Sequence, residues 1–182
     1  MTTNGNGKLP QFWDSISLED IPANGWQKLE VVEVNPIQSS DELSWLQGDQ
    51  LMCKIRCMIS EGQHQGTYAN LDLQIGAYSG TTRATGASFS ISEEQSVSTC
   101  LGQIGRILDL AHSGKAPPID SPSQLRGKFQ AVCDTLDGRE FFADVYTNDS
   151  GFTQVKRGAK AIRGVSNPPE VFKSAVPEGF NA

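Results

Sequence analysis

The stretch that decides the fold is Leu125–Asn148, LRGKFQAVCDTLDGREFFADVYTN. We interpret it as two strands joined by the loop Leu136-Asp137-Gly138, because three-residue hairpin loops commonly end in a glycine with a left-handed backbone. The register of this loop makes one face of the hairpin wholly apolar, with the cross-strand pairs Phe129–Val145, Ala131–Ala143 and Cys133–Phe141. The other face carries Lys128, Gln130, Val132, Phe142, Asp144 and Tyr146. Aromatic rings beside a cation on an outward face raise the question of a binding function.

Three further strands are predicted upstream, at Trp26–Pro36, Leu51–Ser60 and Thr67–Ile75. The second and third alternate with the period of two that is typical of a half-buried strand. The inward positions are Leu51, Cys53, Ile55, Cys57, Ile59, Ala69, Leu71, Leu73 and Ile75, and the outward ones are Met52, Lys54, Arg56, Met58, Tyr68, Asn70, Asp72 and Gln74. The segment Gly76–Ser90 is rich in Gly, Ser and Thr, and we interpret it as a surface loop, with a loop that wraps a bound strand as the functional alternative.

One helix is predicted, over Ser92–Ser113. Ser92 and Gln95 form a capping box, in which each side chain satisfies a backbone amide of the first turn. Apolar residues then recur with the helical period, at Val97, Cys100, Leu101, Ile104, Ile107, Leu108 and Ala111. Gly114 occupies the position of a left-handed C-terminal cap.

The predicted order is three strands, one helix and two strands. This is the connectivity of the five-stranded OB-fold barrel, an all-β fold in which one α-helix lies between strands 3 and 4 and plugs one end. We therefore predict an N-terminal arm at residues 1–24, an OB-fold domain at residues 25–148 and an irregular C-terminal tail at residues 149–182.

The composition excludes several classes of function. No apolar run approaches the roughly 20 residues that span a bilayer, and the N-terminus has no signal-peptide core, so we expect a cytoplasmic protein. The four cysteines form no C-x-x-C pair, which argues against zinc, and we interpret them as core thiols in a reducing compartment. His64 and His112 have no nucleophile placed near them in the pattern. We therefore expect no catalytic residue, no metal and no cofactor.

Cations and aromatic rings on the outward positions favour a site for single-stranded nucleic acid, in which rings stack on bases and cations follow the phosphates. The net charge is −6, but a basic run follows the hairpin, in VKRGAKAIRG. The candidate binding residues are Lys54, Arg56, Tyr68, Trp45, Tyr78, Arg83, Lys128, Phe142, Tyr146, Lys156, Arg157 and Lys160.

Each of these residues also has a structural interpretation. The tail or a second subunit could cover Phe142 and Tyr146, and Lys54 and Arg56 could serve as solvated partners of Asp72. Among them we favour Lys54, Arg56 and Tyr68, because ligands of this fold most often bind the face of strands two and three. The alternatives for the whole chain are a protein-interaction or virion-associated β-barrel and an RNA-binding OB-fold.

Four motifs resemble those of phage-encoded OB-fold single-stranded DNA-binding proteins, a group that includes a phage family formerly of unknown function. In chain order they are IPANGWQKLEVVEV, LMCKIRCMISEGQHQGTYANLDLQI, ISEEQSVSTCLGQIGRILDLA and IDSPSQLRGKFQAV, and the similarity spans about Ile21 to Lys160. The resemblance implies sequence-tolerant binding of single-stranded DNA in phage replication, recombination or repair, in the cytoplasm of a bacterial host cell.

The same resemblance implies that replication or recombination proteins are candidate partners, and it leaves a homo-oligomer open. The chain departs from many single-strand binders at its end. AVPEGFNA carries a single acidic residue, Glu178, where those proteins have an acidic tail.

Overall fold

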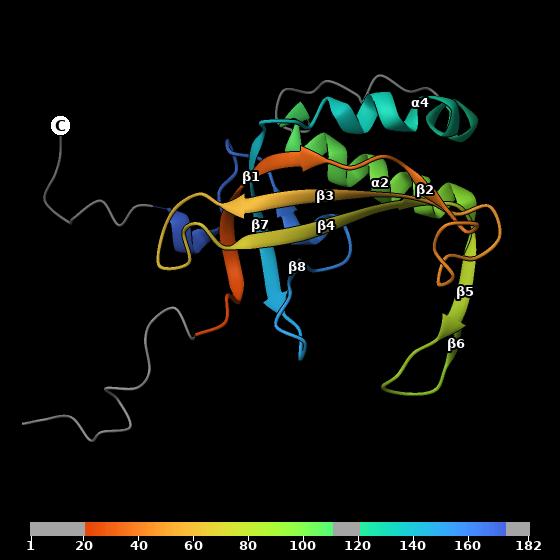
Figure 1. Ribbon diagram of the computed structural model, residues 1–182, viewed down its shortest axis with the longest axis horizontal. Helices are drawn as coiled ribbons and strands as arrows, with labels where there is room; N and C mark the ends of the chain where they lie inside the picture. The colour runs from red at the N-terminus through yellow and green to blue at the C-terminus, as the bar shows by residue number, and fades with distance from the viewer. Residues whose placement is uncertain (1–20, 111–120, 174–182) are drawn as a thin grey trace, which may run out of the picture.

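Five strands of the chain close into a β-barrel (Figure 1). The computed structural model describes residues 21–110 and 121–173. The barrel strands are β1 (Gly25–Val34), β3 (Leu51–Ile59), β4 (Tyr68–Ile75), β7 (Glu140–Thr147) and β8 (Thr153–Val155). β1 pairs with β3, β3 with β4, β4 with β8, β8 with β7 and β7 with β1, which closes the ring. The β4–β8 pair is parallel and the other pairs are antiparallel, so the barrel is mixed.

The predicted alternation of the second and third strands is confirmed. Cys53, Ile55, Cys57 and Ile59 of β3 are fully buried, and the inward side chains of β4 are buried with them in one apolar core. Met52 is an exception, because we expected it to face outward and it is fully buried. The short strand β2 (Gln38–Ser39) pairs with β3 at this position.

All four cysteines are buried and free, as expected for core thiols. Burial raises the pKa of Cys57, and it raises the pKa of Cys100 to about 12. A hydrogen bond with Cys53 is the main cause of the raised pKa of Cys133, with burial next. The thiols of Cys57, Cys100 and Cys133 are therefore protonated near neutral pH.

The predicted hairpin is wrong in its first half. Residues Pro122–Asp134 form the helix α4, with Pro122 in its first turn, where the missing amide proton of proline costs nothing. Leu125, Phe129, Cys133 and the following Leu136 are buried at helical spacing, whereas Ala131, which a strand would bury, is exposed. The second half is confirmed, because β7 buries Phe141, Ala143 and Val145, and Gly138 has the expected positive φ of 70°.

The main helix, α2 (Glu93–Ile107), begins with the predicted capping box between Ser92 and Gln95. It buries Val97, Cys100, Ile104 and Ile107 in the core, and α4 packs against it (Figure 1). Its predicted place directly after the third strand is wrong, because α2 follows the sixth strand, β6. The predicted cap at Gly114 lies outside the described residues.

Two segments that we expected to be irregular contain strands. Within Gly76–Ser90 the chain forms most of an antiparallel ribbon of β5 (Tyr78–Thr81) and β6 (Ser88–Ile91), a separate sheet that projects from the barrel (Figure 1). Beyond residue 148 the chain adds β8, the short strand β9 (Ile162–Arg163) beside β7, and the 3-10 turns η2 (Ala159–Ala161) and η3 (Glu170–Phe172). Most of the predicted arm at residues 1–24 lies outside the described residues.

Two glycine substitutions test this architecture by urea unfolding. Gly76 has a φ of 113°, and a Cβ there would lie 2.8 Å from the Cα of Gln50, so Gly76→Ala should destabilise the protein by about 1–3 kcal/mol. Gly127 lies within α4, where a Cβ meets open space, so Gly127→Ala should stabilise it by about 0.5–1 kcal/mol. A loss of stability in Gly127→Ala would contradict the helical assignment of this segment.

Candidate functional site

A row of outward side chains crosses four barrel strands. Arg56 on β3 lies opposite Asn70 on β4, Asn70 lies opposite Gln154 on β8, and Gln154 lies opposite Tyr146 on β7. The Tyr146 hydroxyl lies 3.0 Å from Gln154 Oε1 and donates a hydrogen bond to it. We call these four residues the cross-strand row. It offers a cation, two amides and a phenol ring on one continuous face.

An arginine–tyrosine stack stands at the β3 end of this row. The guanidinium carbon of Arg56 lies 4.0 Å from the ring centroid of Tyr68, and 50% of Tyr68 is exposed. Arg56 also lies 3.9 Å from a carboxylate oxygen of Glu33, in a pair that is open to solvent. An exposed ring can stack on a flat ligand, and an exposed guanidinium can bind an anion beside it.

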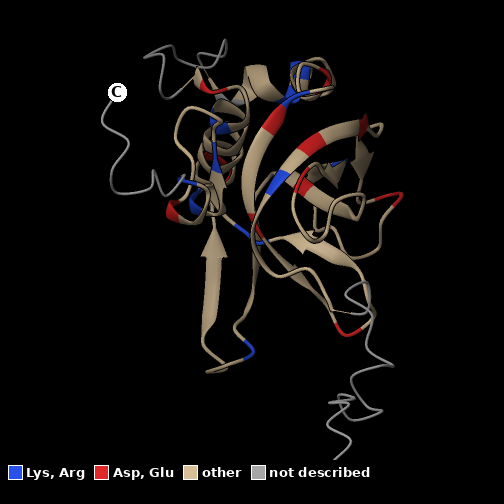
Figure 2. Ribbon diagram, turned by 90° about the vertical axis from the view of Figure 1, so that its left-hand side faces the viewer, with Lys and Arg blue, Asp and Glu red and all other residues tan. Residues whose placement is uncertain are grey.

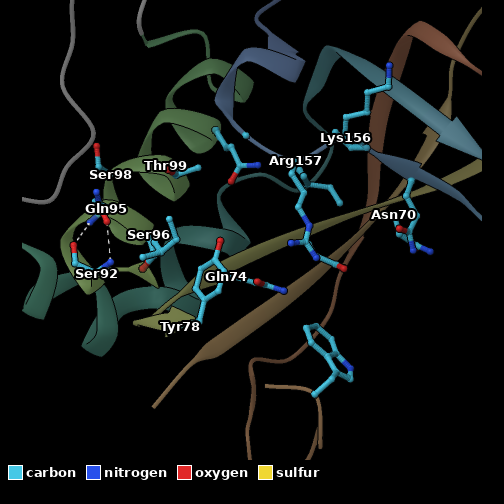
Figure 3. Close-up of a pocket in the computed structure, with 18 of the residues that line it drawn as sticks. Asn70, Gln74, Tyr78, Ser92, Gln95, Ser96, Ser98, Thr99, Lys156 and Arg157 are labelled. Carbon is cyan, nitrogen blue, oxygen red and sulfur yellow. Dashed lines mark hydrogen bonds between the residues drawn. The ribbon is translucent and has the colours of Figure 1, made fainter. Parts of the chain in front are cut away.

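The other end of the row opens into a groove of about 1020 Å³ (Figure 3). Its floor is the outer face of β4, and its walls come from α2, the β5–β6 ribbon and the segment after β8. Arg157 reaches into the groove toward Gln74 (Figure 3). The polar lining residues include Asn70, Asp72, Gln74, Ser92, Gln95, Ser96, Ser98, Thr99, Gln103, Gln154, Lys156 and Arg157, and the aromatic ones are Trp45, Tyr78 and Tyr146.

The wall that carries Trp45 and Tyr78 is held by hydrogen bonds at its base. The side-chain amide of Gln47 donates to the carbonyl of Ser79 (2.9 Å) and accepts from the Ser79 amide (3.1 Å), which ties the loop before β3 to the ribbon. Ser96 Oγ accepts from the Gly76 amide (2.9 Å) and donates to the Glu93 carbonyl (2.9 Å), which ties the end of β4 to the first turn of α2. These hydrogen bonds therefore hold the barrel end of the β5–β6 ribbon in place.

Charges of both signs line the groove, with Asp72, Glu94, Lys156 and Arg157 among its residues. Figure 2 shows basic and acidic positions interspersed along the chain. Asp72 lies opposite Lys54 in the β3–β4 register, and one of its oxygens is buried without a hydrogen bond. Burial raises the pKa of Asp72, and the charges of Lys54 and Arg157 partly offset the rise. Lys156 forms an ion pair with Asp144 at 2.9 Å. The cations of this region are thus partly balanced by carboxylates in the protein itself.

The structure brings together eight of the twelve predicted site residues. They are Lys54, Arg56, Tyr68 and Tyr146 on the outer face of the barrel, and Trp45, Tyr78, Lys156 and Arg157 around the groove, which Tyr146 also lines. Trp45 is 52% exposed, and Tyr78 meets Phe89 edge to face, with their ring centroids 6.0 Å apart.

Four predicted residues lie elsewhere. Phe142 is covered by Phe172, with ring centroids 4.9 Å apart, because η3 returns over β7. Lys128 lies on α4 and Arg83 in the turn of the β5–β6 ribbon, so neither belongs to the groove lining. Lys160 lines a smaller hollow of about 500 Å³ together with Arg106 and Arg163.

Sequence reasoning missed the amides of this site. Asn70 and Gln74 lie at outward positions of a correctly predicted strand, but amides carry neither the positive charge nor the ring that indicates a single-strand binding surface. Gln154 was not recognised because β8 is too short to show a pattern. Gln103 lies on a predicted helix, and its alignment with the groove depends on how α2 packs on β4. Phe152, which is 62% exposed in the turn between β7 and β8, was also missed.

Within residues 21–110 and 121–173, no cluster of three His, Cys, Asp or Glu side chains could hold a metal ion. No helix in these ranges is long and apolar enough to cross a membrane.

Comparisons of the chain with protein-family models, with curated proteins and with solved structures give no match.

The link between Gln47 and Ser79 gives a prediction for the ribbon. Gln47→Ala removes two hydrogen bonds, each worth about 1 kcal/mol, so the ribbon should open more often and trypsin should cleave after Arg83 about fivefold faster or more. Mass spectrometry of timed digests measures the cleavage. Gln65→Ala, an exposed glutamine in the turn between β3 and β4, is the matched control and should leave the rate unchanged. Equal rates in both variants would show that Gln47 does not hold the ribbon.

Proposed function

We propose that this protein binds single-stranded DNA without strong sequence preference and without catalysis. The observation that carries the proposal is the cross-strand row, which joins the Arg56–Tyr68 stack to the groove on one continuous face. Single strands are held by rings that stack on bases and by cations that follow the backbone, and this face offers both. Stacking on an aromatic side chain contributes about 1–3 kcal/mol per base and tolerates any base.

The arrangement of the barrel supports an OB-fold assignment. Taken along the chain, the barrel strands are β1, β3, β4, β7 and β8, and their order around the ring is first, second, third, fifth and fourth. In OB-folds the face of the second and third strands and the loops after the first and fourth strands bind oligonucleotides. Here that face carries Arg56 and Tyr68, and those two loops carry Trp45 and Phe152, both exposed.

The proposed setting follows the resemblance of the four sequence motifs. We place the protein in the replication, recombination or repair of bacteriophage DNA, in the cytoplasm of a bacterial host cell. Lys156 and Arg157 can follow the backbone of a strand that leaves the row through the groove, and an incoming phosphate would compete with Asp144 and Asp72 for them. Because the chain carries a net charge of −6, binding depends on these local cations and not on the overall field.

Tryptophan fluorescence with oligo-dT tests the proposal directly. We expect quenching at low salt, because Trp45 lies exposed beside the groove, and weaker binding as the salt concentration rises. Trp45→Phe should remove most of the quenching. The proposal would be abandoned if no quenching occurred at low salt or if the affinity did not depend on salt.

Two substitutions separate stacking from charge. Tyr68→Ala should weaken binding by about fivefold or more with little change in stability, since half of the ring is exposed. Arg56→Ala should lower the slope of log K against log salt by about one. Lys128→Ala, a cation on α4 away from the row, is the control and should change neither quantity. Loss of stability with unchanged DNA affinity in Tyr68→Ala would favour a face that binds protein, and preference for oligo-U over oligo-dT would favour RNA.

A further inference from the structure

We propose that the groove beside α2 reads the edge of one base and prefers a base with an exocyclic amino group to thymine or uracil. Gln103 is the residue that holds the base edge in place, and the carboxylates of the groove give the preference its direction. The inference rests on the proposed function and deepens it, because it adds one selective position to an otherwise tolerant path.

Gln103 is a buried amide whose side chain has no hydrogen-bond partner among the described residues. It is 6% exposed and lines the groove, and its side chain makes no hydrogen bond to any residue in the described ranges. Its side-chain oxygen and nitrogen are not among the fully enclosed polar atoms, so the small exposed part of the residue includes its amide. A base that fills the groove displaces the water that reaches this amide. A base edge that pairs with the amide therefore binds more tightly than one that leaves it unpaired.

The surroundings of Gln103 suit a base better than a phosphate. Asn70 and Gln74 on the floor and Gln154 on β8 are amides, and Thr99 lies one turn before Gln103 on α2. Amides pair with base edges through one donor and one acceptor, whereas a phosphate needs donors alone. Tyr78 and Tyr146 line the same groove from different elements and offer rings on which a base can stack.

The carboxylates of the groove set the direction of the preference. Asp72 and Glu94 line it, and an ionised carboxylate accepts hydrogen bonds but cannot donate. An exocyclic amino group, as in cytosine or adenine, can donate a hydrogen bond to such an oxygen. The O4 carbonyl of thymine or uracil is itself an acceptor, so it cannot form a hydrogen bond with the carboxylate. Arg157, which could donate to a carbonyl, is exposed and lies within the field of Asp72, and we assign it to the phosphate backbone.

Oligo-dC and oligo-dU of about 12 nucleotides test the inference, since this length lies within the site sizes of OB-folds. The two bases differ only at C4 and N3, so the contributions of base stacking and backbone contacts largely cancel in the ratio of the two dissociation constants. At neutral pH we expect the unmodified protein to bind oligo-dC about tenfold more tightly, a difference of about 1.4 kcal/mol.

Three variants assign the preference to Gln103. Gln103→Leu, of similar volume but without the amide, should bring the ratio of the two dissociation constants close to one. Gln103→Glu, which only accepts while ionised, should raise the ratio above that of the unmodified protein. Gln65→Ala, at an exposed glutamine in the turn between β3 and β4 that does not line the groove, should leave the ratio unchanged. Because each ratio is measured within one variant, a change in stability cancels, and a purely structural role of Gln103 would leave all four ratios equal.

The outcomes separate the two proposals. Equal affinity of the unmodified protein for oligo-dC and oligo-dU overturns the selective position and leaves single-strand binding intact. Failure of every oligomer to bind at low salt overturns single-strand binding, and the selective position with it. If Gln103→Leu does not fold, the ratio in the unmodified protein and its change in Gln103→Glu decide the matter.

Discussion

The parallel pairing of β8 with β4 is the contact on which both the barrel and the proposed binding face depend. β8 has only three residues, Thr153–Val155, yet it fills the gap between β4 and β7. Thr153 and Val155 point into the barrel and are buried, and Gln154 between them faces outward. Without this strand, β4 and β7 would have open edges and the cross-strand row would break between Asn70 and Tyr146. One short strand therefore both closes the barrel and makes the cross-strand row continuous.

The helix α2 has a similar double role. Its apolar stripe completes the barrel core, and the polar side chains beside that stripe form a wall of the groove. Ser96 connects the two roles, because its buried hydroxyl fixes the end of β4 at Gly76. Gly76 must be a glycine, since its backbone has a positive φ and Gln50 leaves no room for a Cβ. The position of the ribbon beyond it follows from this local geometry.

The sequence predicts the regular parts of this fold well because their patterns are long. β1, β3, β4 and β7 and the start of α2 lie where alternation and the capping box place them. The helix α4 was mistaken for a strand because Phe129 and Cys133 are four residues apart, a spacing that fits both periods. Leu125 and Leu136 extend the helical period, and the exposed Ala131 breaks the strand period. The three-residue β8 carries no period at all, so only tertiary pairing reveals it.

The sequence also does not predict which side chains of the candidate site are accessible to a ligand. The alternation of side chains along β7 correctly places Phe142 and Tyr146 on the outer face, but it does not show which of the two rings is exposed to solvent. Phe142 is closed by Phe172, 30 positions along the chain, whereas 38% of Tyr146 remains exposed. The direction of a side chain is thus a local property, and its accessibility is set by segments far away in sequence. The same holds for Gln103. In the sequence it is a polar residue that interrupts the apolar stripe of a helix. Only the packing of α2 against β4 places it in the lining of the groove.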